Sequence, residues 1–329
     1  MPAFELDYAD PELESRVRLS IDEVEKQLGA ATESEQRFVS EAAVHLLRAG
    51  GKRFRPLVVL LAAEFGDPSA ADVVPAAVVV ELTHLATLYH DDVMDEATLR
   101  RGAPTANSRW GNSMAILVGD YLFAGASTVV ADLGPEAVRI QAATFARLVQ
   151  GQIRETLGPA DDEDPLEHYL GVVADKTGAL IATSALFGAR MSGAAPEVEH
   201  LLTRFGEKIG SAFQLSDDVI DVASDEGDSG KTPGTDLREG VPTLPTLLAR
   251  RSTDPADERL LSLLARPLTQ DDEVDEALGL LRAHACVEQA RAFVRREADE
   301  ARAMLEDLDD VPARRAFASL CDLVVSRVG

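Results

Sequence analysis

The sequence predicts a mostly α-helical protein, and three observations support this fold class. Apolar residues make up 46% of the 329 positions, with Ala, Leu and Val the commonest among them, and aromatic residues make up only 5%. Long segments without Gly or Pro, the residues that interrupt helices, run between the breaks in the chain. Helix formers in this arrangement favour a helical bundle over a β-sandwich or a barrel. Because no stretch marks a linker, we expect one all-α domain over residues 1–329.

Eight apolar or amphipathic segments are expected to form helices along the first two thirds of the chain. They cover residues 13–28, 35–48, 57–65, 73–95, 113–133, 136–156, 168–191 and 196–223. Gly50 and Gly51 stop the second helix. The tripeptide Lys176-Thr177-Gly178 is expected to weaken or kink the seventh, because Thr and Gly are poor helix formers.

The remaining segments are expected to be arms, loops and shorter helices. Residues 1–10 are predicted to be a loose arm, and residues 100–105 a loop. Residues 224–245 are dense in Gly, Pro, Asp, Ser and Thr and show no helical period, which is typical of a functional loop. Three to five further helices should follow, broken near residues 254–255 and 267.

The charge balance and the cysteines limit the classes of partner and the cellular compartment. The chain has 32 basic and 57 acidic residues, a net charge of −25. Such a surface disfavours nucleic acid and anionic lipid. Cys286 and Cys321 belong to no CxxC or His-rich spacing, so we expect buried thiols in a reducing compartment.

Targeting and membrane signals are weak in this sequence. The first residues lack a basic stretch followed by an apolar one, so we expect no signal peptide. The most membrane-like stretch, residues 73–89, contains Pro75, Glu81 and His84, which are costly in a spanning helix. We therefore expect a cytoplasmic protein without an integral membrane segment.

Two clusters of the form Asp-Asp-x-x-Asp end two of the expected helices. The clusters are Asp91, Asp92 and Asp95, and Asp217, Asp218 and Asp221. Residues three or four apart share a helix face, so each cluster directs several carboxylates at one small volume. Concentrated negative charge is unfavourable without a cation, and Mg²⁺ commonly combines protein carboxylates with substrate phosphates. The pair of clusters predicts a Mg²⁺-bridged diphosphate site.

Other interpretations of the clusters are weaker. One copy alone would more often be a solvated helix end, but the second copy favours a function. A di-iron bundle needs two Glu-x-x-His pairs, and the sequence offers one, at Glu81 and His84. A metal-binding helical bundle without turnover remains the non-enzyme alternative.

Basic residues gather at three places in this acidic chain. They follow the Gly-Gly break, follow the first acidic cluster, and lie at the expected kink, as Lys52, Arg53, Arg55, Arg100, Arg101 and Lys176. Backbone N–H groups at a break and cationic side chains can together hold a phosphate. The alternatives are a solvated loop for the first group and charge compensation of the aspartates for the second.

With these motifs in order, the chain resembles the trans-type isoprenyl (polyprenyl) diphosphate synthases over nearly its whole length. The matching stretches are residues 50–56, 84–95, 100–102, 119–120, 176–178, 213–218, 230–231 and 234–240. The resemblance implies an all-α bundle of the isoprenoid synthase type with a central apolar cavity. It also implies a homodimer that joins isopentenyl diphosphate head to tail onto an allylic diphosphate. Val241 is a departure, because the family often has a lysine there, so one cationic contact to diphosphate is absent or replaced.

The resemblance also implies roles for individual residues. Two or three Mg²⁺ ions would be bound by Asp91, Asp95 and Asp217, with support from Asp92, Asp218 and Asp221. The allylic diphosphate would contact Arg100, Lys176, Thr177, Gln214 and Lys231. Isopentenyl diphosphate would contact Gly51, Lys52, Arg55, His84 and Arg101. The catalytic set would be Asp91, Asp92, Asp95, Lys176, Thr177, Asp217 and Asp218, while residues 224–245 would close over the site.

Product length should depend on the apolar channel behind the first cluster. Ala86 and Thr87 lie five and four positions before Asp91, where short-chain members of the family commonly have an aromatic floor, and Leu82 lies deeper. Small side chains leave the channel open, so we expect a long product of the kind used for quinone side chains. The alternatives are a geranylgeranyl or other short-chain product, and a subunit of a hetero-oligomeric synthase.

Overall fold

The computed structural model of the chain describes residues 6, 8, 10–223 and 233–328. In this described part, the regular structure is helical apart from one short hairpin, which pairs β1 (Leu99–Arg100) with β2 (Ala103–Pro104) in antiparallel register. The predicted all-α fold class is confirmed. The expected loop at residues 100–105 contains most of this hairpin and then enters a short helix.

The chain folds into two compact units, and each is assembled from three separate segments. The first unit contains residues 1–146, 180–206 and 307–317, and the second contains residues 147–179, 207–306 and 318–329. Neither unit corresponds to a continuous stretch of sequence. The expectation of a single domain over residues 1–329 stays a prediction.

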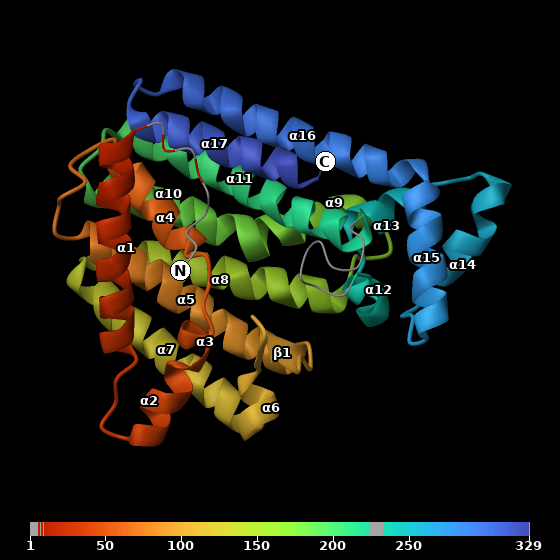
Figure 1. Cartoon of the computed structure of the whole chain (residues 1–329), viewed down its shortest axis with the longest axis horizontal. Coiled ribbons are helices and arrows are strands. Elements are labelled where there is room, and N and C mark those ends of the chain that lie inside the picture. Colours follow the sequence, from red (N-terminus) through yellow and green to blue (C-terminus); the bar gives the residue numbers. More distant parts are fainter. Residues whose placement is uncertain (1–5, 7, 9, 224–232, 329) are drawn as a thin grey trace. The chain divides into compact units, whose positions relative to one another are not determined.

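The first unit is built around α5 (Val73–Met94), which packs against α1, α4 and α7 (Figure 1). Its other helices are α1 (Pro11–Ala31), α2 (Arg37–Ala43), α3 (His45–Arg48), α4 (Phe54–Ala63), α6 (Ala106–Trp110), α7 (Asn112–Asp132) and α10 (Ala179–Met191). Thirteen residues of α5 are buried, including Leu82, Leu85 and Ala86. A helix that is apolar on most of its faces is expected to lie inside a bundle.

The start of the chain differs from the expected loose arm. Leu6 and Tyr8 are both buried, at 9% and 6% exposure. The Asp10 side chain then accepts a hydrogen bond from the Leu13 N–H at 2.8 Å and caps α1, and Pro11 occupies the first turn. Two apolar side chains and a good N-cap fix the described part of this segment.

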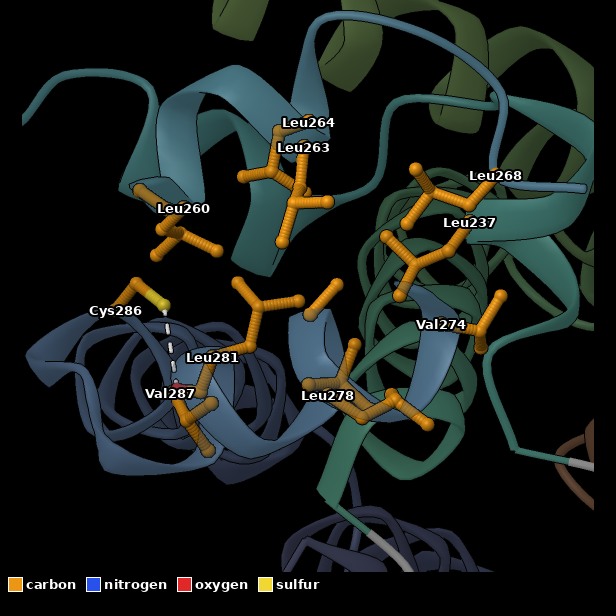
Figure 2. Packing of buried hydrophobic residues seen from close by; sticks show 13 residues of the cluster. Leu237, Leu260, Leu263, Leu264, Leu268, Val274, Leu278, Leu281, Cys286 and Val287 are labelled. Atoms are coloured by element: carbon orange, nitrogen blue, oxygen red, sulfur yellow. Dashed lines mark hydrogen bonds between the residues drawn. The ribbon is translucent and has the colours of Figure 1, made fainter. Parts of the chain in front are cut away.

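The second unit contains the ends of three helices and most of the C-terminal half. Its elements are the end of α8 (Pro135–Leu157), α9 (Pro165–Val173), the π-helical turn Ala174–Gly178, the end of α11 (Pro196–Ala223), α12 (Thr235–Glu239), α13 (Leu244–Ala249), the 3₁₀ turn Pro255–Asp257, α14 (Glu258–Leu264), α15 (Asp271–Ala283), α16 (Ala285–Met304) and the end of α17 (Pro312–Arg327). Leu237, Leu260, Leu281 and Cys286 belong to its buried apolar cluster, and Figure 2 shows their side chains converging from separate helices.

The predicted functional loop is only partly a loop. Residues 224–232 lie outside the described residues, but Thr235–Glu239 form α12 between two glycines in the left-handed region, Gly234 (φ 78°) and Gly240 (φ 75°). Thr243 and Thr246 then form a capping box that starts α13. Gly and Thr residues therefore mark the ends of short helices in this segment. A search for helical periodicity in the sequence does not detect helices this short.

The long helices agree best with the sequence predictions. The helix expected over residues 196–223 has those bounds, and the helix expected over residues 73–95 ends one residue earlier, with Asp95 as its C-cap. The helix expected over residues 35–48 is divided at Val44 into α2 and α3. The expected kink at residues 176–178 is confirmed as the π-helical turn.

Three helical stretches are long and apolar enough to cross a membrane by length and composition. They are Val73–Met94, Asn112–Asp132 and Pro165–Met191. The protein itself buries 67% of the most apolar part of the first and 61% of the third, but only 33% of the second. The expectation that the chain has no integral membrane segment stays a prediction.

Candidate active site

The first acidic cluster lies at the C-terminal end of α5. Asp92 is fully buried and forms an ion pair with Arg100 on β1. Burial raises the pKa of Asp92, and the neighbouring Arg100 guanidinium opposes this shift. The second carboxylate oxygen of Asp92, Oδ2, is buried without a hydrogen-bond partner. Such an orphaned carboxylate oxygen suits a hard cation or a bound water.

A group of cationic side chains adjoins this cluster in the first unit. Desolvation lowers the pKa of the half-buried Arg55 guanidinium to about 10, and its buried Nε has no hydrogen-bond partner. Burial lowers the pKa of His84 well below its usual value, and Arg55 and Arg101 lower it further. These groups share one low-dielectric region with Asp91, whose charge favours the protonated form of Arg55. An entering anion would relieve this excess of positive charge.

Gly51 shapes the loop before α4. A Cβ at this position would lie 2.7 Å from Arg53 Nη1 and 2.8 Å from Arg101 Nη1, so only glycine leaves room for both guanidinium groups. Arg101 donates to the carbonyl oxygens of Gly50 and Leu46, the second at 3.2 Å. Lys52 is exposed beside this loop. The structure thus brings Gly51, Arg55, His84 and Arg101 together.

Arg53 has a structural role, unlike its neighbours in the sequence. It is 5% exposed, and it pairs with Glu25 at 2.5 Å and with Glu81 at 3.1 Å. Its backbone has φ 50°, in the left-handed region. The two carboxylates neutralise this arginine, so it is a poor candidate for holding a phosphate.

The second acidic cluster lies near the end of α11, in the second unit. Asp218 is 5% exposed and accepts hydrogen bonds from the Tyr169 hydroxyl and from Gln214 Nε2, the latter at 3.1 Å. Asp217 accepts from Arg327 on α17. Asp221 accepts from the backbone N–H of Asp236 at 3.4 Å, which connects the cluster to α12.

The π-helical turn presents two predicted site residues beside this second cluster. Lys176 Nζ lies 2.5 Å from Glu155 Oε2 on α8. The Thr177 hydroxyl donates to Gln214 Oε1 at 3.4 Å, and Gln214 in turn donates to Asp218. Thr177 and Gln214 are therefore linked to Asp218, whereas Lys176 is paired with Glu155 on α8. Lys231 lies outside the described residues.

The predicted chain-length residues lie on α5. Ala86 and Leu82 are buried at 1% and 0% exposure, and the partly exposed Thr87 donates its hydroxyl to His84 O at 2.8 Å. Opposite them on α7, a Cβ on Gly119 would lie 3.2 Å from Ala86 O and 2.3 Å from His90 Nε2. The two helices therefore approach closely at this level because Gly119 has no side chain.

Sequence reasoning missed two polar partners of the second cluster. Tyr169 precedes Lys176 by two helical turns, so the two residues share a helix face. This spacing could have predicted that Tyr169 lies at the site. Arg327 is two residues from the end of the chain and belongs to no motif. Its guanidinium also lies 4.3 Å above the Phe213 ring and donates to Ser216 Oγ at 3.2 Å.

In the described residues, no three His, Cys, Asp or Glu side chains already converge as a metal cage. Mg²⁺ commonly uses only one or two carboxylates and completes its shell with substrate phosphates and water, so each cluster by itself suits such an ion. An α-helical bundle with two Asp-Asp-x-x-Asp clusters beside buried cations defines the class of enzymes that bind diphosphates through divalent cations.

Comparisons with known proteins identify the family within this class. The family model described as polyprenyl synthetase matches residues 36–281. A nonaprenyl diphosphate synthase of Mycobacterium tuberculosis is 50% identical over 98% of this chain and 97% of its own. A heptaprenyl diphosphate synthase component 2 of Geobacillus stearothermophilus is 39% identical over 92% of this chain and 93% of its own.

A solved structure agrees with both sequence relatives. The geranylgeranyl pyrophosphate synthase of Corynebacterium glutamicum, complexed with calcium and isoprenyl diphosphate, has a TM-score of 0.88 and 47% identity, and the match covers 99% of each chain. The chain belongs to the polyprenyl synthetase family and is a prenyltransferase. The predicted family and reaction class are confirmed.

Proposed function

We propose that the protein is a long-chain trans-polyprenyl diphosphate synthase that extends an allylic diphosphate with isopentenyl diphosphate in successive head-to-tail steps. The observation that supports this best is the buried, half-satisfied Asp92 at the end of α5, beside the cations Arg55, Arg100 and Arg101. A site with both orphaned carboxylate and guanidinium atoms suits a metal-bound diphosphate.

The metal would be Mg²⁺, with two or three ions held by Asp91, Asp95 and Asp217 and supported by Asp92, Asp218 and Asp221. The calcium reported with the Corynebacterium glutamicum enzyme supports a divalent cation in a related protein. The bound ions would neutralise the diphosphate and so make it a better leaving group. The orphaned Oδ2 of Asp92 is the observation in this chain that fits such an ion.

The protein's own residues would bind the two substrates and protect the reacting carbon. Gly51, Lys52, Arg55, His84 and Arg101 would hold isopentenyl diphosphate. Arg100, Lys176, Gln214 and Lys231 would hold the allylic diphosphate, and Lys176 would exchange Glu155 for it. Thr177 would direct its carbonyl or hydroxyl oxygen towards the developing allylic cation. The departing diphosphate would accept the proton, and residues 224–245 would exclude water.

Small side chains at Ala86 and Thr87 support a product longer than geranylgeranyl diphosphate, as does the nonaprenyl synthase among the relatives. The 47% identical geranylgeranyl synthase supports the short-chain alternative. The relative named component 2 supports the second alternative, a subunit of a hetero-oligomeric synthase.

One assay separates these candidates. The purified protein alone is incubated with farnesyl diphosphate, isopentenyl diphosphate and Mg²⁺, and the products are identified by mass spectrometry. We expect a ladder that continues beyond geranylgeranyl diphosphate. Products that stop at geranylgeranyl diphosphate would support the short-chain alternative, and a protein that extends nothing by itself would contradict the self-sufficient enzyme.

Ala86→Phe tests the chain-length role in the same assay. A phenyl ring at this buried position of α5 should close the channel, so we expect the longest product to lose several isoprene units while the first condensation continues. Asp91→Asn serves as the inactive reference. An unchanged ladder in the Ala86→Phe variant would place the channel floor elsewhere.

We further propose a cytoplasmic homodimer. Apolar side chains on the outer face of α7 support an interface, since Ile116 is 43% and Leu117 is 58% exposed. The free, buried thiols of Cys286 and Cys321 support a reducing compartment. Light scattering after size exclusion measures the oligomeric state, and a monomer at micromolar concentration would contradict the dimer.

A further inference from the structure

The π-helical turn Ala174–Gly178 interrupts an otherwise α-helical stretch between α9 and α10. Single π turns are rare and occur frequently at functional sites. This turn contains Lys176 and Thr177, two residues of the candidate site. Because a π turn is locally less favourable than continued α-helix, neighbouring groups must hold it in place.

One face of α8 contacts this turn through four residues at helical spacing. They are Arg147, Gly151, Arg154 and Glu155, which follow one another at i, i+4, i+7 and i+8. Arg147 Nε donates to Asp175 Oδ1 at 3.0 Å, and Arg154 Nη1 lies 3.4 Å from the other carboxylate oxygen. Asp175, immediately before Lys176, is therefore bound by two guanidinium groups.

Gly151 sets the distance between α8 and the turn. A Cβ on Gly151 would lie 2.9 Å from the Lys176 backbone N and 3.0 Å from Asp175 Cβ. Both distances are too short for ordinary contact, and the Lys176 N belongs to backbone that cannot rotate away. The absent side chain lets the π turn approach the α8 backbone.

The opposite side of the turn is fixed to α11 in a similar way. A Cβ on Gly178 would meet Ser211 Oγ at 2.9 Å and Glu207 O at 3.1 Å. Arg147 Nη2 reaches Glu207 Oε1 at 2.6 Å, so one guanidinium joins α8, the turn and α11. These ion pairs are partly exposed, and each alone would contribute little to stability. Their geometry instead determines where the turn lies.

We propose that Arg147 is a positioning residue for the allylic diphosphate. It binds Asp175 and Glu207 and, with Gly151, fixes the position of the π turn from which Lys176 and Thr177 reach the substrate. The inference rests on the proposed function of Lys176, and it adds three residues outside the stretches that carry the family resemblance: Arg147, Gly151 and Asp175.

The Arg147→Met variant, which removes the charge, tests the proposal in two measurements. The first is steady-state kinetics at saturating Mg²⁺, and the second is calorimetric binding of a non-hydrolysable farnesyl thiodiphosphate. In Arg147→Met we expect the allylic KM and the Kd of the analogue to rise about three- to tenfold, the range for coupled residues in one network. The isopentenyl KM should stay within about twofold. Arg147→Lys should restore part of the loss.

Arg139→Met is the matched control. Arg139 lies on the same helix, its side chain is 71% exposed, and it pairs with Glu136 one turn away. It should leave both KM values unchanged. Equal rises of the allylic and isopentenyl KM values in Arg147→Met would overturn the proposal. So would KM values in Arg147→Met that match those of the Arg139→Met control.

Gly151→Ala perturbs the turn without removing a charge. It is the second test of the proposal, and it can be used even if Arg147→Met does not fold. The new methyl group should push the Lys176 backbone away and raise the allylic KM selectively. Gly279→Ala on α15 is its control, because a Cβ there meets nothing within 4 Å. An unchanged allylic KM in Gly151→Ala would contradict the close approach as the source of positioning.

A double-mutant cycle separates positioning from general destabilisation. If Arg147 acts through Lys176, Arg147→Met should change allylic binding by less than about twofold in a Lys176→Met background, because coupled effects are not additive. Full multiplication of the two effects would overturn the proposal. A Lys176→Met variant with unchanged allylic binding would instead refute the proposed role of Lys176, and the positioning role would fall with it.

Discussion

Asp217 has a cationic partner that no sequence motif reveals. Arg327 donates to this aspartate and to Ser216 Oγ, and its guanidinium stacks on the Phe213 ring. The pair is partly buried, so water screens it incompletely. Arg327 therefore occupies one of the directions from which a divalent cation would approach the Asp217 carboxylate.

Arg327→Gln should ease the binding of Mg²⁺ at the second cluster. Without a competing guanidinium, we expect the Mg²⁺ concentration for half-maximal thermal stabilisation with diphosphate to fall roughly two- to fivefold, because an ion pair of this kind is worth about 1 kcal/mol. The unfolding free energy without Mg²⁺ should fall by a similar amount. Arg315→Gln on the same helix, with a 57% exposed side chain, is the control. A weaker response to Mg²⁺ in Arg327→Gln would instead indicate that Arg327 assists the metal site.

Tyr89 links α5 to the segment before the Gly-Gly loop. Its hydroxyl donates to Ala42 O at 2.5 Å and accepts from the Leu46 N–H at 3.3 Å, and the side chain is fully buried. Tyr89→Phe should lower the unfolding free energy by about 1 to 3 kcal/mol, because it removes two buried hydrogen bonds and takes the hydroxyl acceptor from the Leu46 N–H. Urea denaturation monitored by circular dichroism measures this change, and a loss below about 0.5 kcal/mol would contradict it.

The same hydroxyl predicts how stability depends on alkaline pH. Burial raises the pKa of Tyr89 to about 12. Between the ordinary value near 10 and this value, the unfolded chain releases the phenol proton while the folded protein retains it, so stability should fall as the pH rises from 10 to 12. Tyr89→Phe should show a shallower decline than the wild type, measured by urea midpoints from pH 9 to pH 11.5. Parallel declines would show that other groups cause the loss.

At the scale of helices and turns, long elements were predictable and their contacts were not. Helices α5 and α11, which carry the acidic clusters near their C-terminal ends, are long and show a clear helical period, so period alone located them. The kink at residues 176–178 was also predictable, because Thr and Gly weaken a helix. Its form as a π turn depends on Arg147 and Gly151, which are distant in sequence. Tyr169, Arg327 and Arg53 likewise acquire their roles from long-range partners, which one sequence does not reveal.

The crossing of α4 and α10 depends on one glycine. A Cβ on Gly188 would lie 2.1 Å from the carbonyl oxygen of Val59, a backbone atom of α4. Gly188→Ala must therefore separate two helices of the first unit, and we expect a loss of about 2 to 3 kcal/mol in unfolding free energy. Gly29→Ala, where a Cβ meets nothing within 4 Å, should be neutral or stabilising by up to about 1 kcal/mol. Equal effects in the two variants would contradict the close crossing.

At the scale of the whole molecule, the sequence combines a strong net negative charge with anionic substrates. The net charge of −25 repels diphosphates at long range, so the proposed binding would depend on the local cations Arg55, Arg100, Arg101 and Lys176. Two of these four, Arg100 and Lys176, are paired with carboxylates in the structure, and the partial burial of Arg55 reduces the screening of its charge by water. In the proposed function, the short-range attraction of these cations would have to outweigh the repulsive field of the surface.

The same excess of charge should make the folded protein more stable in moderate salt. The Debye length falls from about 30 Å at 0.01 M to about 8 Å at 0.15 M, so salt removes the long-range repulsion among unpaired carboxylates first. Salt also weakens the attractive surface pairs, but each of those contributes only about 0 to 1 kcal/mol. Because the net charge is −25, repulsion should dominate, and the melting temperature should rise by roughly 2 to 4 °C between these NaCl concentrations. Scanning calorimetry at pH 7.5 measures the shift, and sodium fluoride at equal ionic strength should give a similar rise, since the effect depends on ionic strength. A melting temperature that falls with NaCl would show that the attractive ion pairs between helices contribute more to the stability of the bundle than the excess acidic residues cost it.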